Sequence, residues 1–551
     1  MSLHSAKAFP RPVVHPWIFN IIIAIIITFF QNIIFFKKIL GLVDISQLNN
    51  LLFFLSMPVT LLFALNFIFS FLLLPYIRKP IIILIFISDA LAQYFMLSYG
   101  VLIDRGMVQN VLDTTPMESF SLLSPQLIYH FLVLGVLPSL IILWIKVKPV
   151  SFSWHTAGFY FLNILLSLCV IALVATFFYK DYASLMRNNP QLIKNLVPSD
   201  MAVGGYSYYK HDYIKNMPFV QIGLDAHKTV PINDNQKKNL LIVVVGETSR
   251  GQDFSLGGYD KLTNPRLARD NVVYFPNTSS CGTATAVSVP CMFSNMTRAH
   301  FDDDTAAHED NVLDILQRAH VNILWRENDG GCKYVCNRVA TEDLSKWKDL
   351  PQFCSDGVCL DEALLHNLDA YINEQNNDTV IVLHTMGSHG PSYYQRYQAA
   401  QAAFSPTCDT NEIQKCSNQA LVNTYDNTIV YIDYLLDKSI KLLQAHQDKF
   451  NTALVYLSDH GESLGENGLF LHGMPYAVAP AQQTHIPMLL WMSPSFVQAQ
   501  GIEDECLRSR AKQQAYSQDN LFATLLGLMN VGTKLYQPAL DIVQPCRMTQ
   551  S

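Results

Sequence analysis

Two stretches of the chain carry side chains that could together transfer a phosphoryl group. The apolar run 241–245 stops at Glu247, and further along lies a loop of small residues that contains Thr285. A buried strand that ends in a carboxylate delivers it to the carboxyl edge of a sheet, where open α/β folds bind ligands. A small-residue loop leading into a helix offers N–H groups and a hydroxyl to phosphate. We therefore predict that Glu247 binds a metal and that Thr285 is a nucleophile, although helix geometry alone does not distinguish Thr285 from Thr283.

Two further apolar runs also end in side chains that bind metals. His384 and His389 follow the first of these runs, Asp459 and His460 follow the second, and His472 comes shortly afterwards. The ends of parallel strands converge in space, so these side chains predict a metal site. Oxygen and imidazole ligands without thiolate fit zinc, with manganese as the alternative.

The predicted metal also explains how a threonine could react. A hydroxyl needs activation before it can attack, because its pKa lies far above neutral. A divalent cation bound to Thr285 would lower that pKa and neutralise a phosphoryl oxygen. A bond between Cys281 and Cys291, which flank the loop, would hold Thr285 in place.

The elements that must position these residues alternate between strand-type runs and helical stretches. We expect strands at 240–245, 321–325, 379–384, 453–458 and 488–491, and helices at 312–319, 364–375, 421–444 and 519–526. This βαβ rhythm predicts a largely parallel sheet that helices cover on both faces.

The cysteines indicate an oxidising compartment. One of the 11 cysteines, Cys169, lies in an apolar segment, and the other ten fall into neighbouring pairs. We expect disulfides within these pairs: Cys281–Cys291, Cys332–Cys336, Cys354–Cys359, Cys408–Cys416 and Cys506–Cys546. A zinc cluster is the alternative, but only two of the pairs have ligand-type spacing.

The first part of the chain reads as a membrane domain. Five segments have the length and apolar character to cross a bilayer, at 17–36, 51–74, 80–99, 127–147 and 158–179. The distribution of basic residues in the short loops places the N-terminus in the cytoplasm. An odd number of crossings then exports everything after Tyr179, in agreement with the cysteines. The net charge of -7 and the lack of a basic stripe argue against a nucleic-acid partner.

We expect three parts: a transmembrane domain at 1–180, an interfacial connector at 181–238 and an exported catalytic domain at 239–551. The connector carries tyrosines beside basic residues, which favour the bilayer interface; a plain linker is the alternative. In the membrane half, Asn110, Thr114 and Glu118 are spaced by four in an exported loop. Spacing alone favours a solvated loop there over a lipid head-group contact.

The chain resembles the lipid A phosphoethanolamine transferase family, which includes the mobile colistin-resistance enzymes. The resemblance covers essentially the whole chain, and its most specific motifs lie at 244–250, 281–293, 328–332, 384–391 and 458–468. It implies five transmembrane helices in the inner membrane of a Gram-negative bacterium. It also implies an α/β alkaline-phosphatase/sulfatase-like domain in the periplasm.

The resemblance implies a function and its partners. Phosphatidylethanolamine would be the donor and a phosphate of lipid A the acceptor, and the enzyme would act within membrane lipids. A water-poor covalent site would favour transfer over hydrolysis. The modification would lower the negative charge of the outer membrane and give resistance to polymyxins such as colistin. No feature indicates an oligomer, and we expect a monomer.

The resemblance also assigns roles to single residues. Thr285 would carry the phosphoethanolamine, and a tight zinc would bind Glu247, Thr285, Asp459 and His460. A second, weaker metal or substrate site would use His389 and His472. The substrate-binding residues would be Asn328, Lys333 and His384 in the catalytic domain, together with Asn110, Thr114 and Glu118, for which the resemblance reverses the preference for a solvated loop.

Three other functions remain as alternatives. A phosphodiesterase, or a transferase of another head group to another acceptor such as a core sugar, would use a similar site. A membrane-anchored sensor of cationic peptides would need neither Thr285 nor the ligand set. A transporter would require charged pairs within the membrane, and these are scarce.

Overall fold

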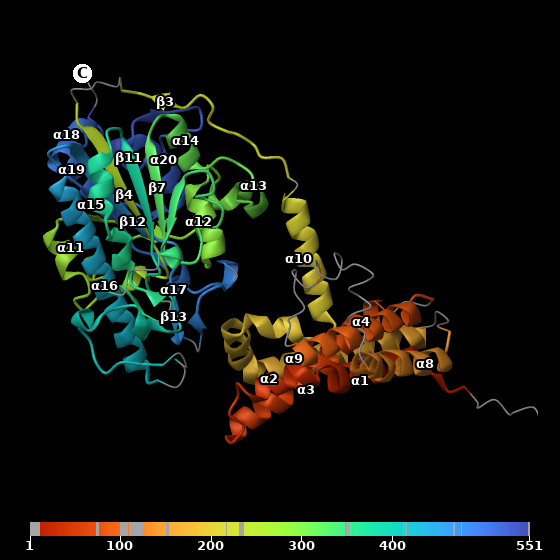
Figure 1. Ribbon diagram of the computed structural model, residues 1–551. Helices are drawn as coiled ribbons and strands as arrows, with labels where there is room; N and C mark the ends of the chain where they lie inside the picture. Colours follow the sequence, from red (N-terminus) through yellow and green to blue (C-terminus); the bar gives the residue numbers. More distant parts are fainter. Residues whose placement is uncertain are drawn as a thin grey trace, which may run out of the picture. The chain divides into compact units, whose positions relative to one another are not determined.

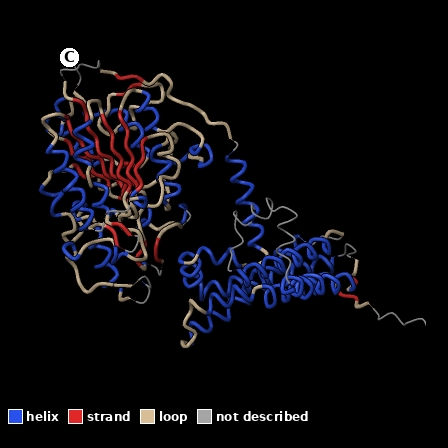
Figure 2. Tube along the Cα trace, in the orientation of Figure 1, coloured by secondary structure: helices blue, strands red, loops and turns tan. Residues whose placement is uncertain are grey.

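The computed structural model groups the chain into two compact units, residues 1–216 and 217–551. It describes residues 11–72, 76–99, 108, 125–149, 154–215, 217–230, 236–347, 350, 352–355, 358–410, 413, 416–466, 469–474 and 476–548. The first unit is almost entirely helical, whereas the second contains a central sheet with helices around it (Figures 1 and 2).

The first unit contains eight described α-helices, most of them apolar. They are α1 (Pro16–Ile26), α2 (Ile33–Leu40), α3 (Leu48–Leu72), α4 (Arg78–Tyr99), α7 (Pro125–His130), α8 (Leu137–Trp144), α9 (Trp154–Asn188) and α10 (Ser199–Lys215). Among the described residues, four helices are long and apolar enough to span a membrane. A fifth span results if the pair 16–31 and 33–40, bent by 53°, is counted as one. These spans match the five expected segments.

The bend in the first span has an identifiable cause at Asn32. A π-helical turn at Ile27–Gln31 precedes this residue, and α2 follows it. The Asn32 side chain donates to the Ile27 carbonyl at 3.1 Å and to the Val197 carbonyl at 2.9 Å, and it accepts from the Val197 N–H at 2.9 Å. The Asn32 amide thus bonds to the backbone of the first helix and to the backbone at Val197, just before α10. The helix therefore breaks at the residue that also fixes the chain leading into α10.

Helices α3 and α9 are joined by a buried polar cluster. Asn66 donates to Asn163 at 3.1 Å and to Ser167 at 2.9 Å, and Asn163 donates to Ser70 at 3.1 Å. Polar contacts of this kind hold transmembrane helices together, since lipid offers these groups no partners.

We expect Asn66→Leu to weaken the packing of α3 against α9 by about 0.5–2 kcal/mol. The substitution leaves Asn163 and Ser167 without their shared partner. Unfolding in mixed detergent micelles, measured for Asn66→Leu, Asn163→Leu and the double variant, gives the coupling energy. Strictly additive losses would mean that the two amides do not interact.

The second unit is built on a seven-stranded sheet with the order β5-β16-β12-β4-β11-β7-β8. These strands are β4 (Lys238–Gly246), β5 (Val273–Tyr274), β7 (Asn322–Glu327), β8 (Ala340–Asp343), β11 (Thr379–His384), β12 (Phe450–Ser458) and β16 (Met488–Met492). Strands β12, β4, β11, β7 and β8 run parallel, and β16 is antiparallel to β12. The predicted parallel sheet is confirmed, with β5 and β8 added at its edges.

Helices cover both faces of this sheet (Figure 1). Strand β4 alternates between the two cores: Leu241, Val243 and Val245 pack on one side, with α14 (Val312–Arg318) and α20 (Asp519–Leu528). Leu240 and Ile242 pack on the other, with α15 (Leu368–Glu374) and α16 (Asn418–Ala445). A strand buried on both faces reads as one continuous apolar run, as this one does.

The helix expected at 364–375 is divided in the structure. A 3-10 helix covers Asp361–Leu365, and α15 begins only at Leu368, after Asn367 with a φ of 56°. The buried Arg326 guanidinium donates to the Leu364 carbonyl at 2.8 Å and to the His366 carbonyl at 2.7 Å. Because these two carbonyls accept hydrogen bonds from an arginine of the sheet, the helix is interrupted at this point.

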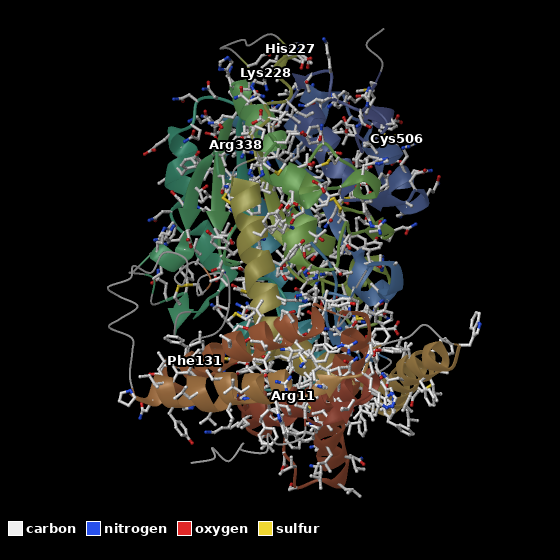
Figure 3. All side chains as sticks on the ribbon, turned by 90° about the vertical axis from the view of Figure 1, so that its right-hand side faces the viewer. Arg11, Phe131, His227, Lys228, Arg338 and Cys506 are labelled. Carbon is white, nitrogen blue, oxygen red and sulfur yellow. A yellow bond between two sulfur atoms is a disulfide. The ribbon has the colours of Figure 1, made fainter. Side chains whose placement is uncertain are left out.

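The five expected disulfides are present. They join Cys281–Cys291, Cys332–Cys336, Cys354–Cys359, Cys408–Cys416 and Cys506–Cys546. Figure 3 labels Cys506, which lies on α19 (Asp504–Gln513). Cys169 has no disulfide partner and lies on α9, among the apolar helices.

Candidate active site

Three metal-type ligands meet at the carboxyl ends of β4 and β12. One ligand atom each from Glu247, Asp459 and His460 lies within 4.8 Å of the others, and all three residues are fully buried. Nε2 of His460 is 3.1 Å from Oδ2 of Asp459 and 3.7 Å from Oε1 of Glu247. Strands β4 and β12 are neighbours, which brings together residues far apart in the sequence.

Burial and hydrogen bonding leave donor atoms of these three residues available to a cation. His460 Nδ1 lies 3.0 Å from the Gly461 carbonyl, so it carries the proton and leaves Nε2 free to bind. Burial, with the positive charge of His472, lowers the pKa of His460 well below its usual value. Burial and the negative charge of Asp459 raise the pKa of Glu247, and Asp459 Oδ2 is buried without a hydrogen-bond partner. These unbalanced charges favour a bound cation.

The structure distinguishes the two candidate threonines. Thr285 is the first residue of α12 (Thr285–Phe293); its hydroxyl donates to Glu247 Oε2 at 3.1 Å and lies 3.4 Å from His460 Nε2. The Thr283 hydroxyl instead donates to the Met474 carbonyl at 2.6 Å. Of these two threonines, only Thr285 contacts the ligand cluster, at a helix N-terminus that favours phosphate.

Gln518 links the loop that carries Thr285 to the strand that carries Asp459. Its side-chain nitrogen donates to the carbonyls of Ser458 at 2.8 Å and Asp459 at 2.7 Å, and its oxygen accepts from the Cys281 N–H at 2.7 Å. Gln518 is fully buried just before α20. No sequence motif pointed to this residue, because its role depends on three segments meeting in space.

The loop after β11 packs against the backbone of Glu247. The Ser388 N–H donates to the Glu247 carbonyl at 3.0 Å, and Gly387 lies against the same backbone. A Cβ atom on Gly387 would lie 2.5 Å from the Glu247 oxygen and 2.9 Å from its nitrogen. Gly387 also has a φ of 48°, which side chains rarely adopt.

We expect Gly387→Ala to displace Glu247 and to abolish tight zinc binding. Gly501→Ala is the matched control, because Gly501 has a φ of 61° but nothing within 4 Å of the added carbon. The control carries only the backbone strain, roughly 1–2 kcal/mol, whereas the clash at Gly387 adds roughly 1–3 kcal/mol. Thermal unfolding and zinc titration check this; equal stability losses with zinc retained in both variants would contradict it.

The two further histidines, His389 and His472, also lie beside Glu247. Together they form a second group whose ligand atoms are within 4.8 Å of one another. Burial and the neighbouring His472 lower the pKa of His389 to about 3. Although burial opposes it, the negative charge of Glu462, 3.2 Å away, raises the pKa of His472 to about 9.

His384 ends β11 and belongs to a third group around Glu247. Its Nδ1 lies 2.9 Å from Glu327 Oε2, at the end of β7, and its Nε2 lies 3.7 Å from Asp329 Oδ2. Although burial opposes it, the hydrogen bond and charge of Glu327 raise the pKa of His384 to about 9. Burial and the charge of Glu247 raise the pKa of Asp329 to about 8.

Of the other predicted substrate-binding residues, the structure describes Asn328 and Lys333. The Asn328 side chain donates to Asp361 at 2.7 Å and to the Cys359 carbonyl at 3.1 Å. These bonds tie Asn328 to the segment 359–361. The positive charge of Lys333 acts on Asp329. Asn110, Thr114 and Glu118 lie outside the described residues. The substrate-binding role of all these residues stays a prediction.

Sequence reasoning missed several acidic residues that lie close in the sequence to predicted ligands or substrate-binding residues. Glu327 and Asp329 flank Asn328, and Glu462 lies two residues after His460. Asp361 accepts from the Met386 and Gly387 N–H groups at 2.7 and 2.9 Å, and so shapes the loop behind Glu247. An acidic residue at the end of a predicted strand, as Glu327 is, could have been found from its position alone.

The fold and the clustered ligands define an alkaline-phosphatase/sulfatase-like domain attached to a helical membrane domain. The sulfatase family model matches residues 239–531, and the model for phosphoethanolamine transferases EptA/EptB matches residues 61–213. These two matches correspond to the two structural units.

Relatives of known name match nearly the full length. The phosphoethanolamine transferase EptA of Escherichia coli (strain K12) is 52% identical over 537 residues, 98% of both chains. The phosphatidylethanolamine transferase Mcr-1 of Escherichia coli is 37% identical over 89% of this chain and 92% of that one. The solved integral membrane lipooligosaccharide phosphoethanolamine transferase A of Neisseria meningitidis is 40% identical, with a TM-score of 0.65, over 97% of this chain and 99% of that chain.

The chain belongs to the phosphoethanolamine transferase family and is a transferase of that class. It is a multi-pass protein of the inner membrane, with its catalytic domain in the periplasm. The disulfides agree with this oxidising location.

Proposed function

We propose that this chain transfers phosphoethanolamine from phosphatidylethanolamine to a phosphate of lipid A, through a zinc-dependent covalent intermediate on Thr285. The names of the relatives support the transferred group, and Mcr-1 is named as a phosphatidylethanolamine transferase. The added ammonium group offsets phosphate charge on the outer membrane, which weakens the binding of cationic polymyxins. Resistance to polymyxin and colistin follows from this charge change.

The observation that carries the proposal is the position of the Thr285 hydroxyl. It donates to Glu247 Oε2 at 3.1 Å and lies 3.4 Å from His460 Nε2, at the start of α12. A nucleophile needs a proton acceptor in contact, and Glu247 is that acceptor here.

A zinc ion fits the residues around Thr285. Asp459 Oδ2 is a buried oxygen without a partner, Glu247 is a buried carboxylate, and His460 presents an unprotonated Nε2. Oxygen and nitrogen donors in this number suit zinc. When bound, the cation lowers the pKa of the threonine hydroxyl and neutralises charge on the phosphoryl group. His389 and His472 would form the second, weaker metal or substrate site.

The reaction has two steps. The Thr285 oxygen attacks the phosphorus of the donor; the bond from phosphorus to the diacylglycerol oxygen breaks, and that oxygen takes up the proton removed from the threonine. A lipid A phosphate oxygen then attacks the same phosphorus and the bond to Thr285 breaks. The threonine oxygen takes up the proton that the attacking phosphate releases. The diacylglycerol leaves before the lipid A acceptor reacts, and this order predicts ping-pong kinetics.

The division of labour along the chain is also part of the proposal. Residues 1–180 anchor the enzyme, 181–238 connect the two halves at the interface, and 239–551 catalyse. Asn110, Thr114 and Glu118 would contact the ethanolamine end of the donor, and Asn328, Lys333 and His384 its head group. Both substrates are membrane lipids, and the enzyme acts as a monomer.

Expression of the chain in a polymyxin-sensitive Gram-negative host, followed by mass spectrometry of its lipid A, tests the proposed function. We expect lipid A to gain one phosphoethanolamine unit, and the host to tolerate more polymyxin. Unmodified lipid A, despite a folded and zinc-loaded protein, would overturn the acceptor assignment. Modification of a core sugar instead would do the same and would retain the transferred group.

A further inference from the structure

Asp329, His384 and Glu247 bring three metal-type donors together from three different strand ends. One ligand atom of each lies within 4.8 Å of the others. Glu247 follows β4, Asp329 follows β7 and His384 ends β11, and these three strands are neighbours in the sheet. Each side chain is almost fully buried: His384 and Glu247 are 0% exposed, and the Asp329 side chain is 5% exposed.

The unused nitrogen of His384 points into this group. Nε2 is buried and has no hydrogen-bond partner, and the nearest carboxylate oxygen, Asp329 Oδ2, is 3.7 Å away. A buried imidazole nitrogen without a hydrogen-bond partner needs an explanation. A distance of 3.7 Å is too long for a hydrogen bond, but it suits two ligands that share a cation.

Glu327 contacts the second ring nitrogen of His384, as carboxylates commonly do for histidines that bind a metal. Its carboxylate lies 2.9 Å from His384 Nδ1, and it also accepts from Trp325 Nε1 at 2.9 Å and from the Asp329 N–H at 2.6 Å. Histidines that bind metals commonly donate their other N–H to a carboxylate, which fixes the ring and the tautomer. The same carboxylate therefore orients both His384 and the backbone of Asp329.

We propose that Asp329, His384 and Glu247 bind a second divalent cation, with Glu327 as the positioning residue behind His384. Two carboxylates and one imidazole suit zinc, with manganese as the nearest alternative in ligand preference. The site shares Glu247 with the tight site and rests on the proposed function. It assigns His384 to a metal in place of a direct contact with the donor head group. It differs from the group formed by His389 and His472 in its other two ligands, although both groups lie beside Glu247.

The charge distribution around Glu247 agrees with this site. The side chains of Glu247, Asp329 and Asp459 are all buried. Buried carboxylates gathered at one place favour a bound cation, which offsets their charge. A cation bound here would lie beside Glu247, which contacts Thr285, where an anionic phosphate must approach.

Zinc counting on the full-length protein in detergent tests the second site. Metal-free wild type, Asp329→Asn and His384→Gln are equilibrated with buffered free zinc, and the bound metal is measured by mass spectrometry after gel filtration. We expect each variant to bind one zinc fewer per chain than wild type while keeping the tightest zinc. Glu327→Gln keeps all ligands and should weaken the second zinc about 10–100-fold.

Cobalt provides a second readout that does not depend on activity. The absorption spectrum of cobalt added after the first equivalent reports the ligands of the second site. We expect this spectrum to change in Asp329→Asn and to stay unchanged in His472→Gln. Unfolding temperatures of the metal-free proteins show whether each variant is folded, and His384→Gln replaces Asp329→Asn if the latter is not.

Asp459→Asn separates this inference from the proposed function. Loss of the tightest zinc in Asp459→Asn, with unchanged zinc counts and cobalt spectra in Asp329→Asn and His384→Gln, would overturn the second site alone. Unchanged tight binding in Asp459→Asn would overturn the tight site of the proposed function. Loss of the second zinc only in His472→Gln would also overturn the inference, because it would assign that ion to the other histidine pair.

Discussion

Thr285→Ala is expected to abolish phosphoethanolamine transfer while leaving the protein folded and zinc-loaded. The substitution removes the only described hydroxyl that contacts both Glu247 and His460. Loss of a covalent nucleophile lowers turnover by about 10³-fold or more. The measurement is the rate of transfer from labelled phosphatidylethanolamine by purified protein, together with the mass of the intact chain, which should show a phosphoethanolamine adduct in wild type only.

Two neighbouring variants make this test specific. Thr285→Ser retains a hydroxyl at the start of α12 and should retain the adduct. Thr283→Ala removes a hydroxyl that serves the Met474 carbonyl, so it should cost about 1 kcal/mol in stability and keep the adduct. An adduct on Thr285→Ala, or its loss in Thr283→Ala with normal zinc, would show that Thr285 is not the nucleophile.

Glu247→Gln is expected to have opposite effects on zinc binding and on the stability of the metal-free protein. It removes a charged ligand, so tight zinc binding should weaken by more than about 100-fold, and transfer should cease. Burial and the charge of Asp459 raise the pKa of Glu247, so the folded protein binds this proton more tightly than the unfolded chain does. The neutral amide avoids placing a buried charge beside Asp459.

The pH dependence of unfolding shows the second effect. The stability that the Glu247 proton provides is complete below the ordinary pKa of glutamate and is lost as the pH rises through the raised value. Metal-free wild type should therefore lose stability with rising pH, while metal-free Glu247→Gln loses less, and the gap between them should widen. Thermal unfolding in a chelator, repeated with zinc, gives both curves. Parallel curves for the two metal-free proteins would contradict the buried charge at Glu247.

Local sequence was enough to predict most of the scaffold. The run 241–245 is apolar throughout because β4 is covered on both faces, and such a run identifies a buried strand without knowledge of its neighbours. The disulfide pairs followed from an even count and from joining cysteines that are neighbours along the sequence, four of the five pairs being ten residues apart or fewer. The helix at 364–375 was wrong as a single element, because Arg326 from a distant strand takes two of its carbonyls.

The sequence by itself determined the types of ligand and the strand ends that carry them, because both follow from local patterns of apolar and polar residues. Only the tertiary structure decided which atoms meet. Thr285 and Thr283 share one loop, yet a contact with Glu247 separates them. Gln518 belongs to no motif, and the motif that contains Asp329 gave no role to its carboxylate. Their roles arise because the sheet order brings distant segments within hydrogen-bonding reach, which no local pattern encodes.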